Sequence, residues 1–486
     1  MYLGIDIGTS EVKVLLLSDS HTVVATAGEA LEVSRPQPGH SEQNPHTWWA
    51  ATQIALSTIR REHPIEYAGV QSIGLSGQMH GAVLLDAFDH VLRPAILWND
   101  SRSAAQCKEM MSAFPRAAQV AGSLIMPGFT APKLKWIAEH EPGIFKKIAK
   151  VLLPKDYVRL QLTGEYITDL SDASGSAWLD VAKRTWSPAL LNLTGMAEAQ
   201  MPRLVEGSSV GGALKREVAD QLGLKAGTLV AGGAGDNASS AIGMGAVNEG
   251  EGFLSLGTSG VLFVVTPGYS PNPSSATHAF CHAVPQRWHQ MSVMLSAASC
   301  LQWARVALNA ASEAALEAAA ASLSLSERSV APLFLPYLSG ERTPHNDAIV
   351  RGSLHGLGHN TGQAELAYSV MEGVTFGLTD GLNALQKAGS TVTRLSLVGG
   401  GARSAMWAQQ LASSLNLEIV THQESTAGGA LGAARLGWLA TGAAVADVCT
   451  RPAASKTYVP NTAEQAMLEP RFARFKALYP SLKIVP

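Results

Sequence analysis

The chain has 486 residues, of which 46% are hydrophobic and 15% charged, a balance that predicts a folded protein and excludes intrinsic disorder. The length predicts more than one domain. A formal net charge of −3 excludes the overall basic field that non-specific binding to nucleic acid or to an anionic membrane requires, so the expected partners are small molecules.

The amino-terminal segment predicts three short strands joined by tight turns, at residues 2–7, 12–17 and 22–27. A helix is predicted next, because Asn44 can cap it and Pro45 suits its first position. Further apolar runs predict strands at 71–75, 82–85 and 91–98. Strands mixed with helices in this way indicate an α/β protein.

A short internal repeat links the two halves of the chain. Residues 4–12 and residues 253–261 both read as a strand, a Gly-Thr-Ser turn and a second strand. This predicts two lobes of related topology, each beginning with the same hairpin. The expected division is 1–245 for the first lobe and 246–486 for the second.

The second half repeats the plan of the first. The pattern predicts a strand at 261–265, an Ala-rich helical region at 296–322 and a strand at 394–398. Helices are expected at 405–413 and, as the last element, at 428–440. The stretch 428–449 is rich in Ala and Gly and is interrupted by Arg435 and Asp447, which excludes a membrane span.

Four cysteines lie far apart without a C-x-x-C pair, so neither a zinc site nor a disulfide framework is predicted. The first residues also lack the basic segment and apolar run of a signal peptide, since an acid, Asp6, interrupts them. Both features indicate a cytoplasmic protein with reduced thiols.

The two Gly-Thr-Ser turns can present successive backbone N–H groups and hydroxyls to phosphate oxygens. The same turns are also common hairpin connections that bind nothing. Asp6, on a strand expected to be buried, needs a cation or hydrogen-bond donors. A magnesium ion at a phosphate site would be such a cation, and the backbone N–H groups of the hairpin would be such donors.

Two glycine-rich segments follow predicted strands. Residues 232–235 lead into Asp236, which is placed either to accept a proton from a bound hydroxyl or to cap a helix. Residues 399–401 can lie against a flat nucleotide base or form a tight turn. The chain contains no Walker phosphate loop, no dinucleotide-binding fingerprint and no H-E-x-x-H motif.

Together these motifs resemble the FGGY family of carbohydrate kinases. The resemblance spans nearly the whole chain and includes two longer stretches, 128–136 and 352–372. It implies the duplicated ribonuclease-H-like fold of actin, hexokinase and the Hsp70 ATPase domain, with a central cleft. It also implies ATP-dependent phosphorylation of D-xylulose at its C5 hydroxyl, with ATP and Mg²⁺ as cofactors.

The resemblance implies a role for each motif residue. Asp236 would be the catalytic base, and Asp6 would hold the magnesium ion. The sugar contacts would be Met79, His80, Trp98, Asn99 and Asn237. The ATP contacts would be Gly8, Thr9, Ser10, Lys13, Gly257, Thr258, Ser259, Gly400, Gly401 and Ser404.

Several alternatives stay open at this point. A kinase of this family acting on ribulose, a fructose-like hexulose, gluconate or glycerol would share the motifs. An actin-fold ATPase or a sugar-responsive regulatory protein would share the fold. A homodimer is compatible with the resemblance, and the segment 336–346 resembles the family without any residue of it receiving a role.

Overall fold

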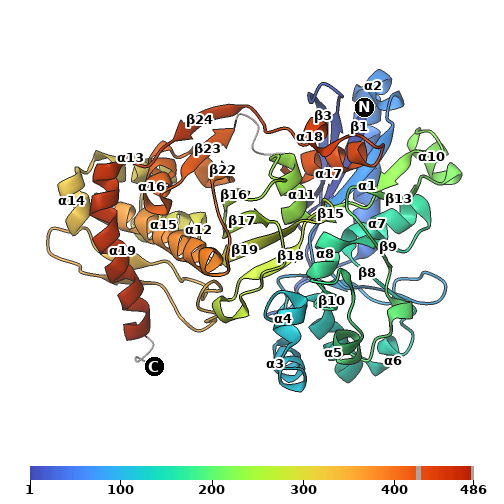
Figure 1. Cartoon of the computed structure of the whole chain (residues 1–486), viewed down its shortest axis with the longest axis horizontal. Helices are drawn as coiled ribbons and strands as arrows, with labels where there is room; N and C mark the ends of the chain where they lie inside the picture. The colour runs from blue at the N-terminus through green and yellow to red at the C-terminus, as the bar shows by residue number, and fades with distance from the viewer. Residues whose placement is uncertain (423–427, 483–486) are drawn as a thin grey trace.

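Two seven-stranded sheets form the framework of the molecule, one from each half of the chain (Figure 1). The computed structural model describes residues 1–422 and 428–482. The first sheet has the order β13-β14-β5-β1-β2-β3, with β15 beside β5. Its strands are β1 (Tyr2–Ile7), β2 (Glu11–Leu17), β3 (Val23–Ala30), β5 (Ser72–Gly77), β13 (Val210–Ala213), β14 (Leu229–Ala231) and β15 (Ala234–Gly235).

The second sheet has the order β18-β19-β17-β16-β22-β23-β24. Its strands are β16 (Glu251–Leu256), β17 (Gly260–Thr266), β18 (His278–Cys281), β19 (Trp288–Met294), β22 (Arg394–Val398), β23 (Glu418–His422) and β24 (Ala454–Tyr458).

The two sheets share one pairing pattern. In the first, β1 runs antiparallel to β2 and parallel to β5. In the second, β16 runs antiparallel to β17 and parallel to β22. The duplication predicted from the nine-residue repeat is therefore confirmed at the level of topology.

Helices cover the two sheets. The first helix, α1, begins at Pro45, and the Asn44 side chain accepts a hydrogen bond from the His46 backbone N–H at 3.1 Å, as the sequence predicts. The helices are α1 (Pro45–Glu62), α2 (Pro64–Ala68), α3 (Ala104–Ala113), α4 (Ala117–Ala121), α5 (Thr130–His140), α6 (Pro142–Phe145), α7 (Pro154–Thr163), α8 (Leu170–Ser174), α9 (Pro188–Asn192), α10 (Arg216–Leu222), α11 (Asp236–Gly243), α12 (Ala298–Ala307), α13 (Glu313–Ser322), α14 (Leu325–Val330), α15 (Gln363–Lys387), α16 (Ala405–Leu415), α17 (Gly428–Leu439), α18 (Val445–Val448) and α19 (Thr462–Leu482).

Helix α17 comes from the second half of the sequence but packs against β1 and β5 of the first sheet (Figure 1). Small residues permit this approach. A Cβ added at Gly4 would lie 1.9 Å from the Ala430 carbonyl oxygen, and one at Gly74 would lie 1.7 Å from the Ala433 carbonyl oxygen. The sequence halves and the packed units therefore do not coincide fully, and the division at 245 stays a prediction.

The helix predicted at 428–440 is confirmed as α17 (Gly428–Leu439), but the prediction that it is the last element was wrong. Helices α18 and α19 follow α17, and α19 contains Pro470 and Pro480, which as helix breakers obscured its pattern. The predicted helical region at 296–322 is two helices, α12 and α13, with Ser312 capping the second.

Short strand pairs lie outside the two large sheets in the first half of the chain, and all of their strands except β4 (Glu42–Gln43) fall between residues 80 and 210. The strand predicted at 91–98 is only two residues long, β7 (Ala95–Ile96), because Pro94 has no N–H to donate. The short pairs are β4 (Glu42–Gln43) with β7, β6 (Val83–Leu85) with β8 (Lys150–Leu152), β9 (Ile167–Asp169) with β12 (Arg203–Val205), and β10 (Leu179–Asp180) with β11 (Thr185–Trp186). In the second half, β20 (Leu333–Leu335) pairs with β21 (Ser353–His355).

All four cysteines are buried and free of disulfides. Within residues 1–422 and 428–482, no helix combines the length and apolar character needed to cross a bilayer.

Candidate active site

Three parallel strands of the first sheet end at one edge and deliver the predicted motifs there. Ile7, the last residue of β1, is in register with Gly77 of β5, and Gly77 is in register with Gly235 of β15. The first Gly-Thr-Ser turn, the turn at 78–81 and Asp236 therefore emerge side by side. Ligands of open α/β sheets bind at such carboxyl ends of strands.

Asp236 is the first residue of α11. Its Oδ1 accepts hydrogen bonds from the Asn237 backbone N–H at 2.8 Å and from the Asn237 side-chain amide at 3.0 Å. Its other oxygen, Oδ2, is not engaged by these bonds. Burial, reinforced by the negative charge of Asp6, raises the pKa of Asp236 to about 7. A carboxylate with a pKa near neutrality suits a general base.

Asp6 is only partly exposed, and its Oδ1 is buried with no hydrogen-bond partner among the described residues. Burial raises the pKa of Asp6, while the Ser76 hydroxyl and, to a smaller extent, the nearby positive charge of Lys13 oppose that rise. The first turn of α17 lies against this carboxylate, since a Cβ added at Gly429 would be 2.4 Å from Asp6 Oδ2. An unsatisfied buried carboxylate oxygen fits a cation ligand.

No three His, Cys, Asp or Glu side chains of the described residues gather closely enough to hold a metal ion by themselves. Magnesium at nucleotide sites is commonly held by one or two carboxylates together with substrate phosphates. The environment of Asp6 therefore fits a magnesium ion that arrives with a nucleotide.

A cavity of about 270 Å³ brings most of the predicted sugar contacts together. Residues from both halves of the chain line it. They are Met79, His80, Trp98, Phe129, Asp236, Asn237, Ser259, Val261, His278, Phe280, Met291, Val293 and Arg342. Asn99 is exposed and is not one of the lining residues, so its sugar contact stays a prediction without geometric support.

His80 is held firmly at this cavity. Its φ of 73° is a left-handed conformation, which costs on the order of 1–3 kcal/mol for a residue other than glycine. The Lys133 ammonium donates to the His80 carbonyl oxygen at 2.9 Å, and the Thr130 hydroxyl donates to the same oxygen at 3.1 Å. The imidazole stacks on the Phe129 ring, with centroids 4.6 Å apart.

The imidazole of His80 is neutral. Burial, with the positive charges of Lys133 and Arg342, lowers the pKa of His80 to about 3. Its Nδ1 lies 2.6 Å from the Gly175 carbonyl oxygen, which can only accept, so Nδ1 carries the proton. The other ring nitrogen, Nε2, is then able to accept a hydrogen bond.

A hydrogen-bonded chain joins this cavity to the first Gly-Thr-Ser turn. The Trp98 indole N–H donates to the Thr9 hydroxyl at 3.0 Å, and that hydroxyl donates to Gln78 Oε1 at 3.0 Å. The Gln78 amide also donates to the Gly8 carbonyl oxygen at 3.2 Å. Trp98 is 47% exposed, which leaves indole surface open to a ligand.

The second Gly-Thr-Ser turn is fixed to the start of α12. The Thr258 carbonyl oxygen accepts from the Ala297 N–H at 2.9 Å, and the Gly257 carbonyl oxygen accepts from the Ala298 N–H at 2.8 Å. Ser259 of this turn lines the cavity of about 270 Å³. The phosphate contacts predicted for these residues, and for Gly8, Thr9 and Ser10, remain predictions. Lys13 forms an ion pair with Glu11 at 3.1 Å.

The glycines at 399–401 end β22 and lead into α16. Gly399 has a φ of 89°, and a Cβ on Gly401 would be 2.5 Å from the Leu256 side chain, so packing already accounts for these two glycines. The Ser404 hydroxyl accepts from the Trp407 N–H at 3.0 Å and donates to Glu317 at 2.6 Å. These bonds make Ser404 a helix cap, and ATP contacts of Gly400, Gly401 and Ser404 stay predictions.

The sequence assigns no role to Arg342, which lines the cavity, or to Lys133, which contacts the His80 backbone behind it. Lys133 lies in the stretch 128–136, which resembles the family in sequence. The sequence does not indicate that its side chain contacts the His80 backbone. Arg342 lies in the segment 336–346 and lines the cavity directly. No local pattern indicates either contact, because each depends on how distant segments pack.

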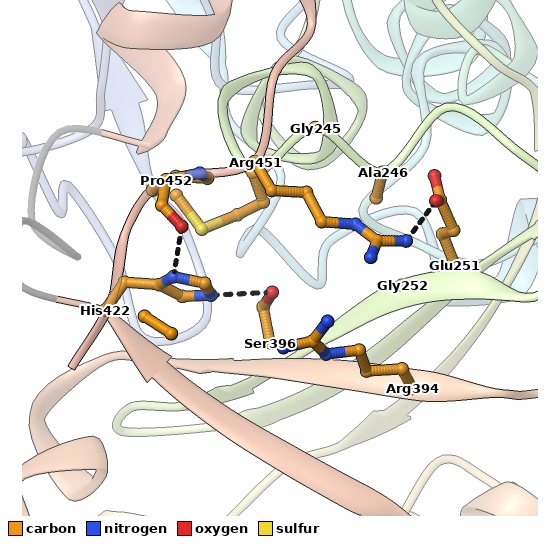
Figure 2. Close-up of a pocket in the computed structure, with 11 residues that line it drawn as sticks. Gly245, Ala246, Glu251, Gly252, Arg394, Ser396, His422, Arg451 and Pro452 are labelled. Atoms are coloured by element: carbon orange, nitrogen blue, oxygen red, sulfur yellow. Dashed lines mark hydrogen bonds and ion pairs between the residues drawn. The ribbon is translucent and has the colours of Figure 1, made fainter. Parts of the chain in front are cut away.

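A second cavity, of about 210 Å³, lies at the opposite ends of β16 and β22 from the glycine turns (Figure 2). Its polar groups are paired with protein atoms. The His422 ring contacts the Pro452 carbonyl oxygen at 3.1 Å and the Ser396 hydroxyl at 2.9 Å, and Arg451 pairs with Glu251. None of the predicted site residues lines this cavity.

Two family models match the chain. The model described as the N-terminal domain of the FGGY family of carbohydrate kinases matches residues 1–243, and the model of the C-terminal domain matches residues 252–441. A protein named xylulose kinase from Escherichia coli (strain K12) is 48% identical over 485 residues, covering 99% of each chain. A xylulose kinase from Bacillus subtilis (strain 168) is 35% identical over 489 residues, covering 99% of this chain and 97% of the relative.

Solved structures are similar over the whole chain. A structure described as a xyloylose kinase from Brucella ovis has a TM-score of 0.97 at 50% identity and covers 100% of both chains. Gluconate kinase from Lactobacillus acidophilus has a TM-score of 0.93 at 26% identity, covering 99% of this chain and 97% of its own. These structures confirm the two-lobed duplicated fold.

Proposed function

The chain belongs to the FGGY family of carbohydrate kinases, and we propose that it transfers the γ-phosphoryl group of ATP to the C5 hydroxyl of D-xylulose, giving D-xylulose 5-phosphate and ADP. The observation that carries the proposal is the cavity where Asp236, Asn237 and His80 from the first half of the chain meet Ser259 from the second. The 48% identity to a xylulose kinase along nearly the full length supports the choice of sugar.

Asp236 acts as the base in this proposal. A sugar hydroxyl is a poor nucleophile, so the reaction needs a carboxylate that accepts the proton while the bond to phosphorus forms. The two bonds from Asn237 hold one carboxylate oxygen in place, which leaves the other to receive the proton of the C5 hydroxyl.

Asp6 would hold Mg²⁺ together with the phosphates of the nucleotide, and the bound ion would supply positive charge to the phosphoryl group in transfer. The turns at 8–10 and 257–259 would bind the phosphates through backbone N–H groups and hydroxyls, and residues 400, 401 and 404 would contact the adenosine. Lys13 would reach the phosphates only by leaving its ion pair with Glu11.

The two halves of the chain contribute different groups, so closure of the cleft would complete the site. Closure would also exclude water from the γ-phosphate, which limits wasteful hydrolysis of ATP. The hydrogen bonds from Trp98 to Thr9 and from Thr9 to Gln78 connect the sugar end of the site to the phosphate end.

The pKa of Asp236 predicts the pH dependence of the reaction. The pKa of the Asp236 carboxyl is about 7. At lower pH the carboxyl is mostly protonated and therefore inactive as a base. We expect kcat/KM for the sugar to rise with pH up to about 7 and then level off. His80 stays neutral around pH 7 because its pKa is about 3. Its titration therefore does not produce the rise of kcat/KM with pH. Rate measurements at constant ionic strength test this, and a flat profile would contradict it.

Removal of the His80 side chain is expected to weaken sugar binding selectively. We predict that His80→Ala raises KM for the sugar by roughly 10-fold or more, since a buried hydrogen bond to substrate is lost, while KM for ATP changes little. Steady-state kinetics with each substrate varied in turn measures both constants. Equal increases in the two constants would show that His80 does not contact the sugar.

Formation of ADP from ATP and Mg²⁺ across a panel of sugars tests the function. The panel contains D-xylulose, L-xylulose, D-ribulose, L-ribulose, D-fructose, gluconate and glycerol, and each assay is repeated with excess chelator. Turnover restricted to D-xylulose and abolished by chelation is the expected result. A preference for another sugar would keep the kinase mechanism and change the substrate, whereas sugar-independent hydrolysis would favour an ATPase.

Two further proposals accompany this function. We place the reaction in the cytoplasm, and we consider a homodimer compatible with the family. A regulatory protein that binds sugar without phosphoryl transfer would have no need of a carboxylate with a pKa near 7 at the cavity, so the geometry favours an enzyme.

A further inference from the structure

Arg342 is presented to the sugar cavity by a short segment that is fastened on both sides. Before it, Glu341 Oε1 accepts from the Leu295 N–H at 3.1 Å. After it, the Thr343 N–H donates to the Val293 carbonyl oxygen at 3.1 Å, and the Thr343 hydroxyl accepts from the Val293 N–H at 3.1 Å. The 341–343 segment is thus tied to the end of β19, and Arg342 lines the cavity beside Val293.

The guanidinium of Arg342 is half-buried and forms no hydrogen bond or ion pair within the part of the chain that the structure describes. A guanidinium carries five N–H donors and no acceptor. Leaving such donors unsatisfied in a partly desolvated cavity costs free energy, which a ligand oxygen would recover.

Arg342 lines the cavity together with His80 and His278. His278 pairs with Met291 between β18 and β19, and its ring lies 5.9 Å from the Phe129 ring on which His80 stacks. The charge of Arg342 lowers the pKa of both His80 and His278. The groups that act on Asp236 are instead Asp6 and Asn237.

We propose that Arg342 binds the carbonyl end of the ketose, through hydrogen bonds from its guanidinium to the C2 carbonyl oxygen or the C1 hydroxyl, while the hydroxyl to be phosphorylated lies at Asp236. This inference rests on the proposed function. A planar fork of donors matches two neighbouring oxygen acceptors, and neutral His80 offers an acceptor to an adjacent hydroxyl. Arg342 is then the residue that makes the site prefer a ketose.

The test is a set of kinetic cycles that combine changes in the protein with changes in the sugar. The protein variants are Arg342→Met, Arg342→Lys and, as a matched control, Arg351→Met, which alters an exposed arginine outside the cavity. The sugars are D-xylulose, its reduction product xylitol and 1-deoxy-D-xylulose. Thermal denaturation of each variant verifies folding.

We expect Arg342→Met to raise KM for D-xylulose by at least about 10-fold, the effect of losing a charged hydrogen bond, while kcat and KM for ATP change by less than about 3-fold. The wild-type preference for D-xylulose over at least one modified sugar should disappear in this variant. Arg342→Lys should restore part of the preference, and Arg351→Met should behave as wild type.

The possible outcomes distinguish failure of the role given to Arg342 from failure of the proposed function. If the wild type phosphorylates D-xylulose and Arg342→Met lowers activity equally on all three sugars, the inference is wrong and the function stands. If the wild type prefers a polyol or gluconate, the inference fails together with the choice of sugar. If the wild type prefers another ketose, the same kinetic cycle with that ketose and its polyol tests the role of Arg342. Should Arg342→Met fail to fold, the loss of preference is measured with Arg342→Gln.

Discussion

Replacement of Asp236 by alanine lowers kcat for the sugar by at least about 10²-fold, the low end of the contribution of a general base. The expectation follows from the position of Asp236 at the carboxyl edge of the first sheet, where one oxygen is held by Asn237. Without the carboxylate, the sugar hydroxyl must lose its proton to water. Binding of ATP should change little, because Asp236 is not part of either Gly-Thr-Ser turn.

Two further variants serve as comparisons for Asp236→Ala. Asp236→Asn retains the volume and the helix-terminal position and removes only the basic oxygen, so it should be as slow as Asp236→Ala. Asp220→Ala removes an exposed carboxylate on α10 and should leave kcat unchanged. Turnover of Asp236→Asn close to that of the wild type would remove Asp236 from the role of base.

Replacement of Lys155 by methionine is expected to produce a large loss of stability. The Lys155 ammonium lies 2.6 Å from Asp156, 2.8 Å from Asp169 and 3.1 Å from Asp172, and all four side chains are fully buried. Burial alone would lower the pKa of Lys155, but the three carboxylates raise it above its usual value. Losing the ammonium leaves Asp169 and Asp172 buried without their cation, while Asp156 keeps Arg159, and breaking such a buried cluster costs about 3–5 kcal/mol.

The buried ion cluster around Lys155 also holds the segment that leads into Asp236. Arg159, which pairs with Asp156 at 2.8 Å, donates to the Gly232 carbonyl oxygen, and the Gly235 N–H lies 3.3 Å from the Ser171 hydroxyl. Gly232 and Gly235 precede Asp236, so loosening the cluster should lower kcat as well as stability.

Thermal denaturation measures the stability effect. We expect the melting temperature of Lys155→Met to fall by roughly 10 °C, given a shift of about 2–4 °C per kcal/mol for domains of this size. Lys183→Met is the matched control, because Lys183 is 77% exposed and pairs with Asp180 at the surface, where such pairs are worth little. Equal melting temperatures for the two variants would show that the buried cluster does not depend on Lys155.

The features that the sequence predicted well are local ones. A cap and a proline define the start of α1, and the repeated Gly-Thr-Ser turns indicate the duplicated hairpin because each is encoded in a few neighbouring residues. Asp236 stood out for the same reason, as a single carboxylate behind a run of glycines. Its neighbours in the cavity, Met79 and His80, came from a resemblance to a family and not from physical reasoning.

The features that the sequence did not reveal depend on contacts between distant segments. Arg342 reaches the cavity only because its neighbours bond to β19, and Lys133 matters only because α5 lies beneath the His80 turn. The packing of α17 on the first sheet needs glycines at positions 4 and 74, which look unremarkable in two short strands. Such contacts have no periodicity in the sequence.

The position of the phosphoryl group in the product tests both the orientation of the bound sugar and the role of Asp236. The wild type and Asp236→Asn are incubated with D-xylulose, ATP and Mg²⁺, and the phosphorylated carbon is identified by phosphorus–proton correlation NMR. We predict a single product, phosphorylated at C5, that the wild type forms and Asp236→Asn does not. A phosphoryl group at C1, or equal product formation by the two proteins, would contradict the assignment of the sugar's orientation and of its base.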